Sequence, residues 1–142
     1  MSQQIRVYRE LKLLDKAVIT TDKDMVIVDD ELVSKRTQTA TAGAAALTIT
    51  AAQLITGVLD STPTEAQTMT LPTPALLVAG IANYKVGSSF LFVVNNKSAY
   101  TITVAAGTGG TADGTLTVAT NVIRAFLVII TSATAYYVYG IG

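Results

Sequence analysis

Few side chains in this 142-residue chain could carry out acid–base or nucleophilic chemistry. The chain contains no histidine and no cysteine, so the commonest general base and the thiol nucleophile are both missing. After Arg36 its only carboxylates are Asp60, Glu65 and Asp113, each near turn-forming residues. Catalysis by paired carboxylates needs two acids that converge on a cleft, whereas we expect these three to be solvated turn residues. The sequence therefore predicts a protein that is not an enzyme and has no cofactor.

Two further segments have compositions that can hold a phosphate or a cation. Residues 107–114, GTGGTADG, are rich in glycine, but a phosphate-binding P-loop ends in Gly-Lys-Ser/Thr and no lysine is present. The following GTLTVAT reads as a strand, so we expect a connection between two strands. Asp29, Asp30 and Glu31 carry oxygen ligands that suit a hard cation, but they lack the spacing of a dedicated calcium loop. A solvated acidic turn is the expected structure there, with no metal site.

The richest aromatic cluster is AYYVYG near the end of the chain, with Tyr136, Tyr137 and Tyr139. In a strand Tyr136 lies on one face, and Tyr137 and Tyr139 lie on the other. Exposed aromatic rings can stack on sugars or bases, and they also serve as core residues and interface anchors. The three tyrosines are therefore candidates for an oligomer interface or for a glycan platform.

Charge is concentrated in the first quarter of the chain. Seven of the ten basic and seven of the ten acidic residues lie within residues 1–36, and the formal net charge is zero. That balance argues against nucleic acid as a partner, because phosphate contacts require basic faces. Only 14% of all residues are charged, against about 25% in an ordinary soluble domain. The surface after Arg36 must be covered by neutral polar residues or by another protein. Threonine is the candidate for the first role, with 22 copies in the chain, mostly after Arg36.

No segment of the chain predicts a signal peptide or a membrane span. MSQQIRVYRE at the start has no apolar core region. Residues 125–142 are uncharged, but Thr131, Ser132 and Thr134 interrupt them, and a bilayer helix needs about 20 predominantly apolar residues.

Short strands separated by turn residues dominate the sequence from Thr37 onward. VIRAFLVII, residues 122–130, is apolar at every position but one and predicts a central strand buried on both faces. Regularly spaced strands of this kind predict an all-β fold, a jelly-roll-like sandwich or a small barrel, with two short helices. The expected strands are 47–50, 57–62, 66–73, 86–96, 100–107, 114–120, 122–130 and 135–142, and the expected helices are 51–56 and 75–82.

Residues 1–36 read as an extended N-terminal arm that precedes the domain 37–142. Apolar spacing in residues 5–14 gives a helical signal, although the β-branched residues there favour a strand almost equally. Met25–Val28 is a short apolar run between acidic residues and predicts a strand. Either MVIV or RVYR could add a strand to the sheet edge of a neighbouring subunit.

The order of motifs resembles small virion proteins of tailed phages and related viruses. The stretches that carry the resemblance are ITAAQLITGVLDSTPTEAQTMTLPTPALLVAGI, VGSSFLFVVNN, YTITVAAGTGGT and NVIRAFLVIITSATAYYVYG. They span about residues 47–139 and are similar to head decoration (cement) proteins and to head-fibre or spike modules. Those proteins have jelly-roll-like β domains and are commonly trimeric, and no catalytic residues come with the resemblance.

The resemblance implies a bacteriophage structural protein that decorates the capsid surface of the virion as a homotrimer. Its partner would be the major capsid protein, with no nucleic acid and no membrane. The alternative that it leaves open is a receptor- or glycan-binding fibre module. The arm would contact the capsid, through Arg6, Arg9, Lys12, Asp22, Lys23, Asp24, Met25, Ile27, Lys35 and Arg36.

Overall fold

The computed structural model describes residues 37–43, 45–55, 57–81 and 83–142. The chain divides into two units, Met1–Ser34 and Lys35–Gly142, and the described residues all belong to the second. That unit is mostly β-structure with two short helices, as the sequence predicts. Neither of the two described helices is long and apolar enough to cross a membrane.

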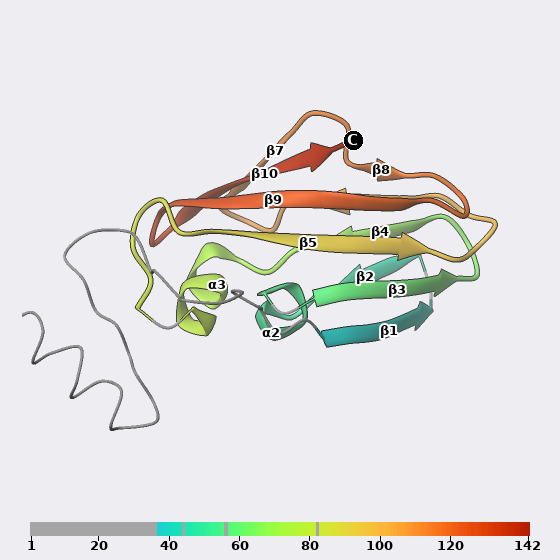
Figure 1. Cartoon of the computed structure of the whole chain (residues 1–142), viewed down its shortest axis with the longest axis horizontal. Helices are drawn as coiled ribbons and strands as arrows, with labels where there is room; N and C mark the ends of the chain where they lie inside the picture. Colours follow the sequence, from blue (N-terminus) through green and yellow to red (C-terminus); the bar gives the residue numbers. More distant parts are fainter. Residues whose placement is uncertain (1–36, 44, 56, 82) are drawn as a thin grey trace, which may run out of the picture. The chain divides into compact units, whose positions relative to one another are not determined.

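The strands form two sheets, which Figure 1 shows one behind the other. The six-stranded sheet contains, in spatial order, β1 (Thr37–Gly43), β3 (Gly57–Pro63), β5 (Ser89–Asn96), β9 (Ile123–Ser132), β10 (Ala135–Ile141) and β7 (Gly110–Asp113). The four-stranded sheet contains β2 (Ala46–Thr48), β4 (Gln67–Thr70), β6 (Ile102–Ala105) and β8 (Thr117–Val118). All the strands expected from the sequence are present, with shifted ends, and β1 and β7 are additional.

From β1 to β9 successive strands alternate between the two sheets, so the chain winds in a coil, and β10 then pairs with β9 in the larger sheet. The strands β1, β3 and β5 pair in parallel in one sheet, and β2, β4 and β6 pair in parallel in the other. Five of the eight pairings among the described strands are parallel. A jelly roll is built from antiparallel Greek keys. The predicted two-sheet β fold is therefore confirmed, but the observed pairings are not those of a jelly roll.

The helices α2 (Ala51–Ile55) and α3 (Pro74–Gly80) lie where the chain returns from the smaller sheet to the larger one (Figure 1). As expected, Thr50 caps α2: the Gln53 backbone N–H donates to Thr50 Oγ1 (3.3 Å), and the Thr50 N–H donates to Gln53 Oε1 (2.9 Å). Pro74 occupies the first turn of α3, where its missing N–H costs nothing. Leu54 and Leu77 anchor the two helices in the core.

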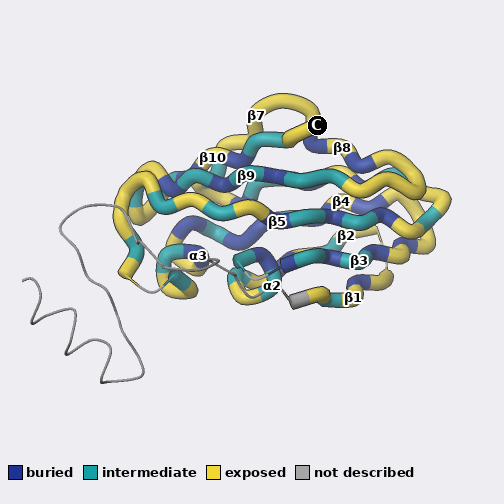
Figure 2. Tube along the Cα trace, viewed as in Figure 1, coloured by how far each residue is buried: buried dark blue, intermediate teal, exposed yellow. Residues whose placement is uncertain are grey.

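The core lies between the sheets and is filled mainly by alternate residues of β3, β4, β5, β6, β9 and β10 (Figure 2). The predicted alternation of Met69 against Thr68, and of Val104 against Thr103, is confirmed, with the apolar residue buried in each case. One expectation is wrong. In β9 only the face with Phe126, Val128 and Ile130 is fully buried, whereas the residues of the other face are partly or largely exposed.

Tyr136 belongs to this core, so its predicted role in an exposed interface or glycan platform is wrong. Its hydroxyl donates to the Pro72 carbonyl (3.1 Å) and accepts from the Gly107 N–H (2.8 Å). Burial of the ring raises the pKa of the phenol. Gly110 lies directly against the ring, where a Cβ would come within 2.3 Å of a ring carbon. The tyrosine thus ties β10 to the loops that follow β4 and β6.

Replacing Tyr136 with phenylalanine tests this tie. The change leaves the buried Gly107 N–H and Pro72 carbonyl without partners, so it should cost about 1–3 kcal/mol of unfolding free energy. Tyr100→Phe, which removes a hydroxyl from a ring that is 45% exposed, is the control and should stay within about 0.5 kcal/mol of wild type. Denaturant unfolding at one fixed protein concentration measures both. Equal stability of the two variants would contradict the assigned role of Tyr136.

Candidate interaction surface

The outer side of the six-stranded sheet carries apolar side chains at the positions that alternate with the buried ones. We call its central part, on β5, β9 and β10, the apolar face. Within it, Leu91 is 41% exposed, Tyr137 39% and Ile141 45%. The residues of the apolar face are Leu91, Val93, Ile123, Ala125, Leu127, Ile129, Tyr137, Tyr139 and Ile141.

Strand register makes these residues a continuous surface. Leu127 lies between Leu91 on β5 and Tyr139 on β10. Ala125 lies in the same way between Val93 and Ile141. Directly opposed side chains on one face have Cβ atoms about 4.5–5.5 Å apart, so these rows are continuous across β5, β9 and β10. The row through Tyr139 then ends at Asp113 on β7. All nine residues of the face are uncharged.

The outer side of the four-stranded sheet has the opposite character. Thr68, Thr103 and Thr117 form a row across β4, β6 and β8, and all three are exposed. Threonine fits a strand and presents a hydroxyl to water. We call this surface the threonine face. It fulfils the expectation that threonine replaces charge on the surface. On the outer side of the six-stranded sheet, exposed threonines lie around the apolar face, at Thr62, Thr111 and Thr131.

Tyr137 and Tyr139 stand parallel to each other on the apolar face. Their ring centroids are 6.0 Å apart and their planes differ by 17°. One side of each ring is therefore turned toward the other ring, and the two rings do not form a flat platform on which a sugar could lie. Tyr137 and Tyr139 are placed as predicted on a shared exposed face, but their geometry suits packing against a protein better than stacking on a glycan.

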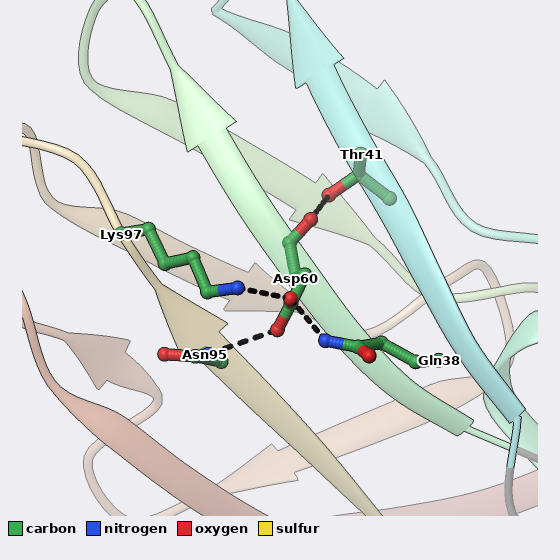
Figure 3. A network of polar contacts seen from close by, with 5 residues as sticks. All are labelled: Gln38, Thr41, Asp60, Asn95 and Lys97. Carbon is green, nitrogen blue, oxygen red and sulfur yellow. Dashed lines mark hydrogen bonds and ion pairs between the residues drawn. The ribbon is translucent and has the colours of Figure 1, made fainter.

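A polar cluster borders the apolar face at β3 (Figure 3). Lys97 and Gln38 both contact Asp60 Oδ2, and Asn95 Nδ2 donates to Oδ1 at 2.8 Å. The expectation that Asp60 is a solvated turn residue is wrong, because it lies within β3 and its side chain is only 11% exposed. The hydrogen bond and charge of Lys97 hold the pKa of Asp60 below its ordinary value. The cluster fastens the edge strand β1 and the end of β5 to β3.

The described carboxylates do not come together as a catalytic or metal-binding group. Asp113 ends β7, four strand spacings from Asp60 on β3, which corresponds to about 19 Å across the sheet. Glu65 lies exposed in the bend after β3, as expected. Among the residues that the structure describes, no three acidic groups are placed to hold a metal ion.

The prediction that the glycine-rich segment 107–114 only connects two strands is wrong, because Gly110–Asp113 forms the strand β7. Two backbone amides of the segment donate hydrogen bonds within the body. The Gly107 N–H donates to Tyr136, and the Gly110 N–H donates to the Gly107 carbonyl at 2.8 Å.

Arg124, on the inner side of β9, donates to the Thr117 carbonyl at 2.9 Å and lies over the Phe126 ring. These contacts are structural.

Sequence reasoning named only the tyrosines of the apolar face and missed its aliphatic residues. The available signal was the run of apolar residues without alternation in LFVV and AFLVII, read together with the threonine alternation in TMT and TIT.

The acidic residues Asp29, Asp30 and Glu31 lie outside the described residues. So does the predicted capsid-binding arm, with Arg6, Arg9, Lys12, Asp22, Lys23, Asp24, Met25, Ile27, Lys35 and Arg36.

Comparison with protein-family models, with curated proteins and with solved structures gives no match to this chain. The surface geometry and the sequence itself therefore carry the functional argument.

Acid should weaken the polar cluster around Asp60. Because its pKa is lowered in the folded state, the ionised carboxylate stabilises the fold above the ordinary value of 3.8, and this contribution is lost as the pH falls through the folded pKa. The melting temperature of wild type should exceed that of Asp60→Asn at neutral pH, and the difference should shrink in acid. Glu65→Gln is the control for loss of one carboxylate. A difference that stays constant with pH would refute this role of Asp60.

Proposed function

We propose that this chain is a non-enzymatic structural protein of a virus particle, which decorates and reinforces the capsid exterior as a homo-oligomer. The sequence resemblance implies a trimer. The proposal rests on one observation: the sandwich has a threonine face suited to water and an apolar face suited to protein. A protein built in this way works by packing against other proteins in an assembly. The resemblance to virion decoration modules supplies the kind of assembly.

The difference between the two outer sides is what favours an assembly role. Singly exposed apolar residues are ordinary, but a contiguous exposed patch of this kind is typical of interaction sites. Interfaces that persist are apolar, like a domain core cut in half. The apolar face has that composition, since Leu91, Leu127 and Ile129 match the residue types of the buried side of the same sheet.

Contact with the major capsid protein is assigned to residues 1–36 in this proposal. Charges of both signs alternate there with apolar residues, as in DKDMVIVDDELVSKR. Such a pattern favours selection of one partner and one register, because like charges in a wrong pairing repel.

A receptor- or glycan-binding fibre module is the second candidate. It would use Tyr137 and Tyr139 as its platform, and the stacking of the two rings on each other does not favour it. A glycan array separates the candidates: reproducible binding by the full chain that Tyr137→Ala abolishes would support the fibre module and count against decoration.

The arm can be tested in the full-length protein. Arg6→Glu, Arg9→Glu and Lys12→Glu together should weaken binding to capsids that lack the protein by about tenfold or more, because they replace attraction by repulsion at the contact. Lys85→Glu, in an exposed loop of the body, should bind as wild type does. Co-sedimentation with capsids measures the affinity, and quantitative mass spectrometry of purified particles measures the copy number. Absence of the chain from particles would overturn the proposed function.

A further inference from the structure

We infer that the edge strand β1 pairs with β1 of a second copy of this chain, in an antiparallel arrangement with Ala40 on the two-fold axis. The inference goes beyond the proposed function, because it follows from the described strands and holds for the chain in any setting. The contact is separate from the trimer that the sequence resemblance implies, because a two-fold contact joins copies in pairs.

The free edge of β1 lacks the features that keep other strands away. Figure 1 shows β1 at the end of the larger sheet, with no described strand beyond it. Natural proteins protect exposed edges with short strands, charged side chains, proline or bulges. The strands at the other three edges, β2, β7 and β8, have two to four residues, and β7 carries Asp113. In contrast, β1 has seven residues, TQTATAG, without charge or proline, and its register with β3 is regular.

The backbone groups of Gln38, Ala40 and Ala42 point toward this free edge. In a parallel ladder the N–H and C=O of one residue face the same neighbouring strand, and those of the next residue face the other way. The Thr64 N–H donates to the Gly43 carbonyl, so Gly43 and every second residue before it face β3. Three N–H and three C=O groups therefore face outward, where none of the described strands receives them.

The symmetry of these groups about Ala40 favours a copy of the same chain over a foreign strand. A two-fold contact requires a surface that complements itself. With Ala40 opposite Ala40 of the copy, Gln38 of each chain lies opposite Ala42 of the other, and every outward N–H meets an outward C=O. Thr39 then lies opposite Thr41, and paired threonines stabilise antiparallel strands. No charge opposes the contact, because β1 is uncharged throughout.

Cysteine cross-linking of the full-length protein tests this pairing, because the chain contains no cysteine of its own. In Ala40→Cys the two Cα atoms would be about 5.5 Å apart, which is within the range of a disulfide. Under mild oxidation this variant should form a covalent dimer at least about tenfold faster than Thr103→Cys at the same concentration, because pairing raises the effective concentration of the thiols. Thr103→Cys is the matched control, since it places an exposed thiol on the threonine face. Equal rates would overturn the inference.

A proline tests the role of the backbone groups. Ala42→Pro, added to Ala40→Cys, removes an N–H that faces outward and leaves the ladder with β3 complete, so the cross-linking rate should fall to that of Thr103→Cys. Circular dichroism must show that the double variant is folded, and Ala42→Lys replaces Ala42→Pro if it is not. A folded double variant that cross-links as fast as Ala40→Cys alone would count against the pairing. Rapid cross-linking of a protein that is absent from particles would refute the proposed function and support this contact.

Discussion

The pleat of a β-strand sends alternate side chains to opposite sides, so a sandwich of two sheets can bury only one face of each sheet. In this protein the two inner faces share one core, and Tyr136 ties its loops together. The outer faces are then free to differ. One is lined by threonine, and the centre of the other is lined by leucine, isoleucine, valine and tyrosine. This difference determines what each side of the body can contact.

The coiled arrangement of strands explains why this fold needs few charged side chains. Parallel strands pair within both sheets through backbone hydrogen bonds, which need no charged side chain. Among the residues described, the charged side chains with hydrogen-bond partners are Asp60, Lys97 and Arg124. Asp60 and Lys97 fasten the β1 side of the larger sheet, and Arg124 closes the inner side against Thr117. The uncharged centre remains available for packing.

Strand positions could be predicted from the sequence because β-branched and apolar residues alternate with a period of two. The pairing of the strands could not be predicted, because successive turns of the coil share no sequence repeat. Paired residues are 20 positions apart in sequence between β1 and β3 and 35 positions apart between β3 and β5. Asp60 was misread because Asp-Ser-Thr-Pro is typical of a turn, whereas its partners Gln38, Asn95 and Lys97 come from distant segments. Alternation separated Tyr136 from Tyr137 but did not reveal which of them points inward.

Solvent paramagnetic relaxation of side-chain methyl groups tests the central claim most directly. With a soluble paramagnetic probe and the full-length protein bound to sedimented capsids, the account predicts that the methyls of Leu127 and Ile129 are shielded, while those of Thr68 and Thr103 relax rapidly. Equal and rapid relaxation on both outer faces would contradict it, because the apolar face would then be open to water.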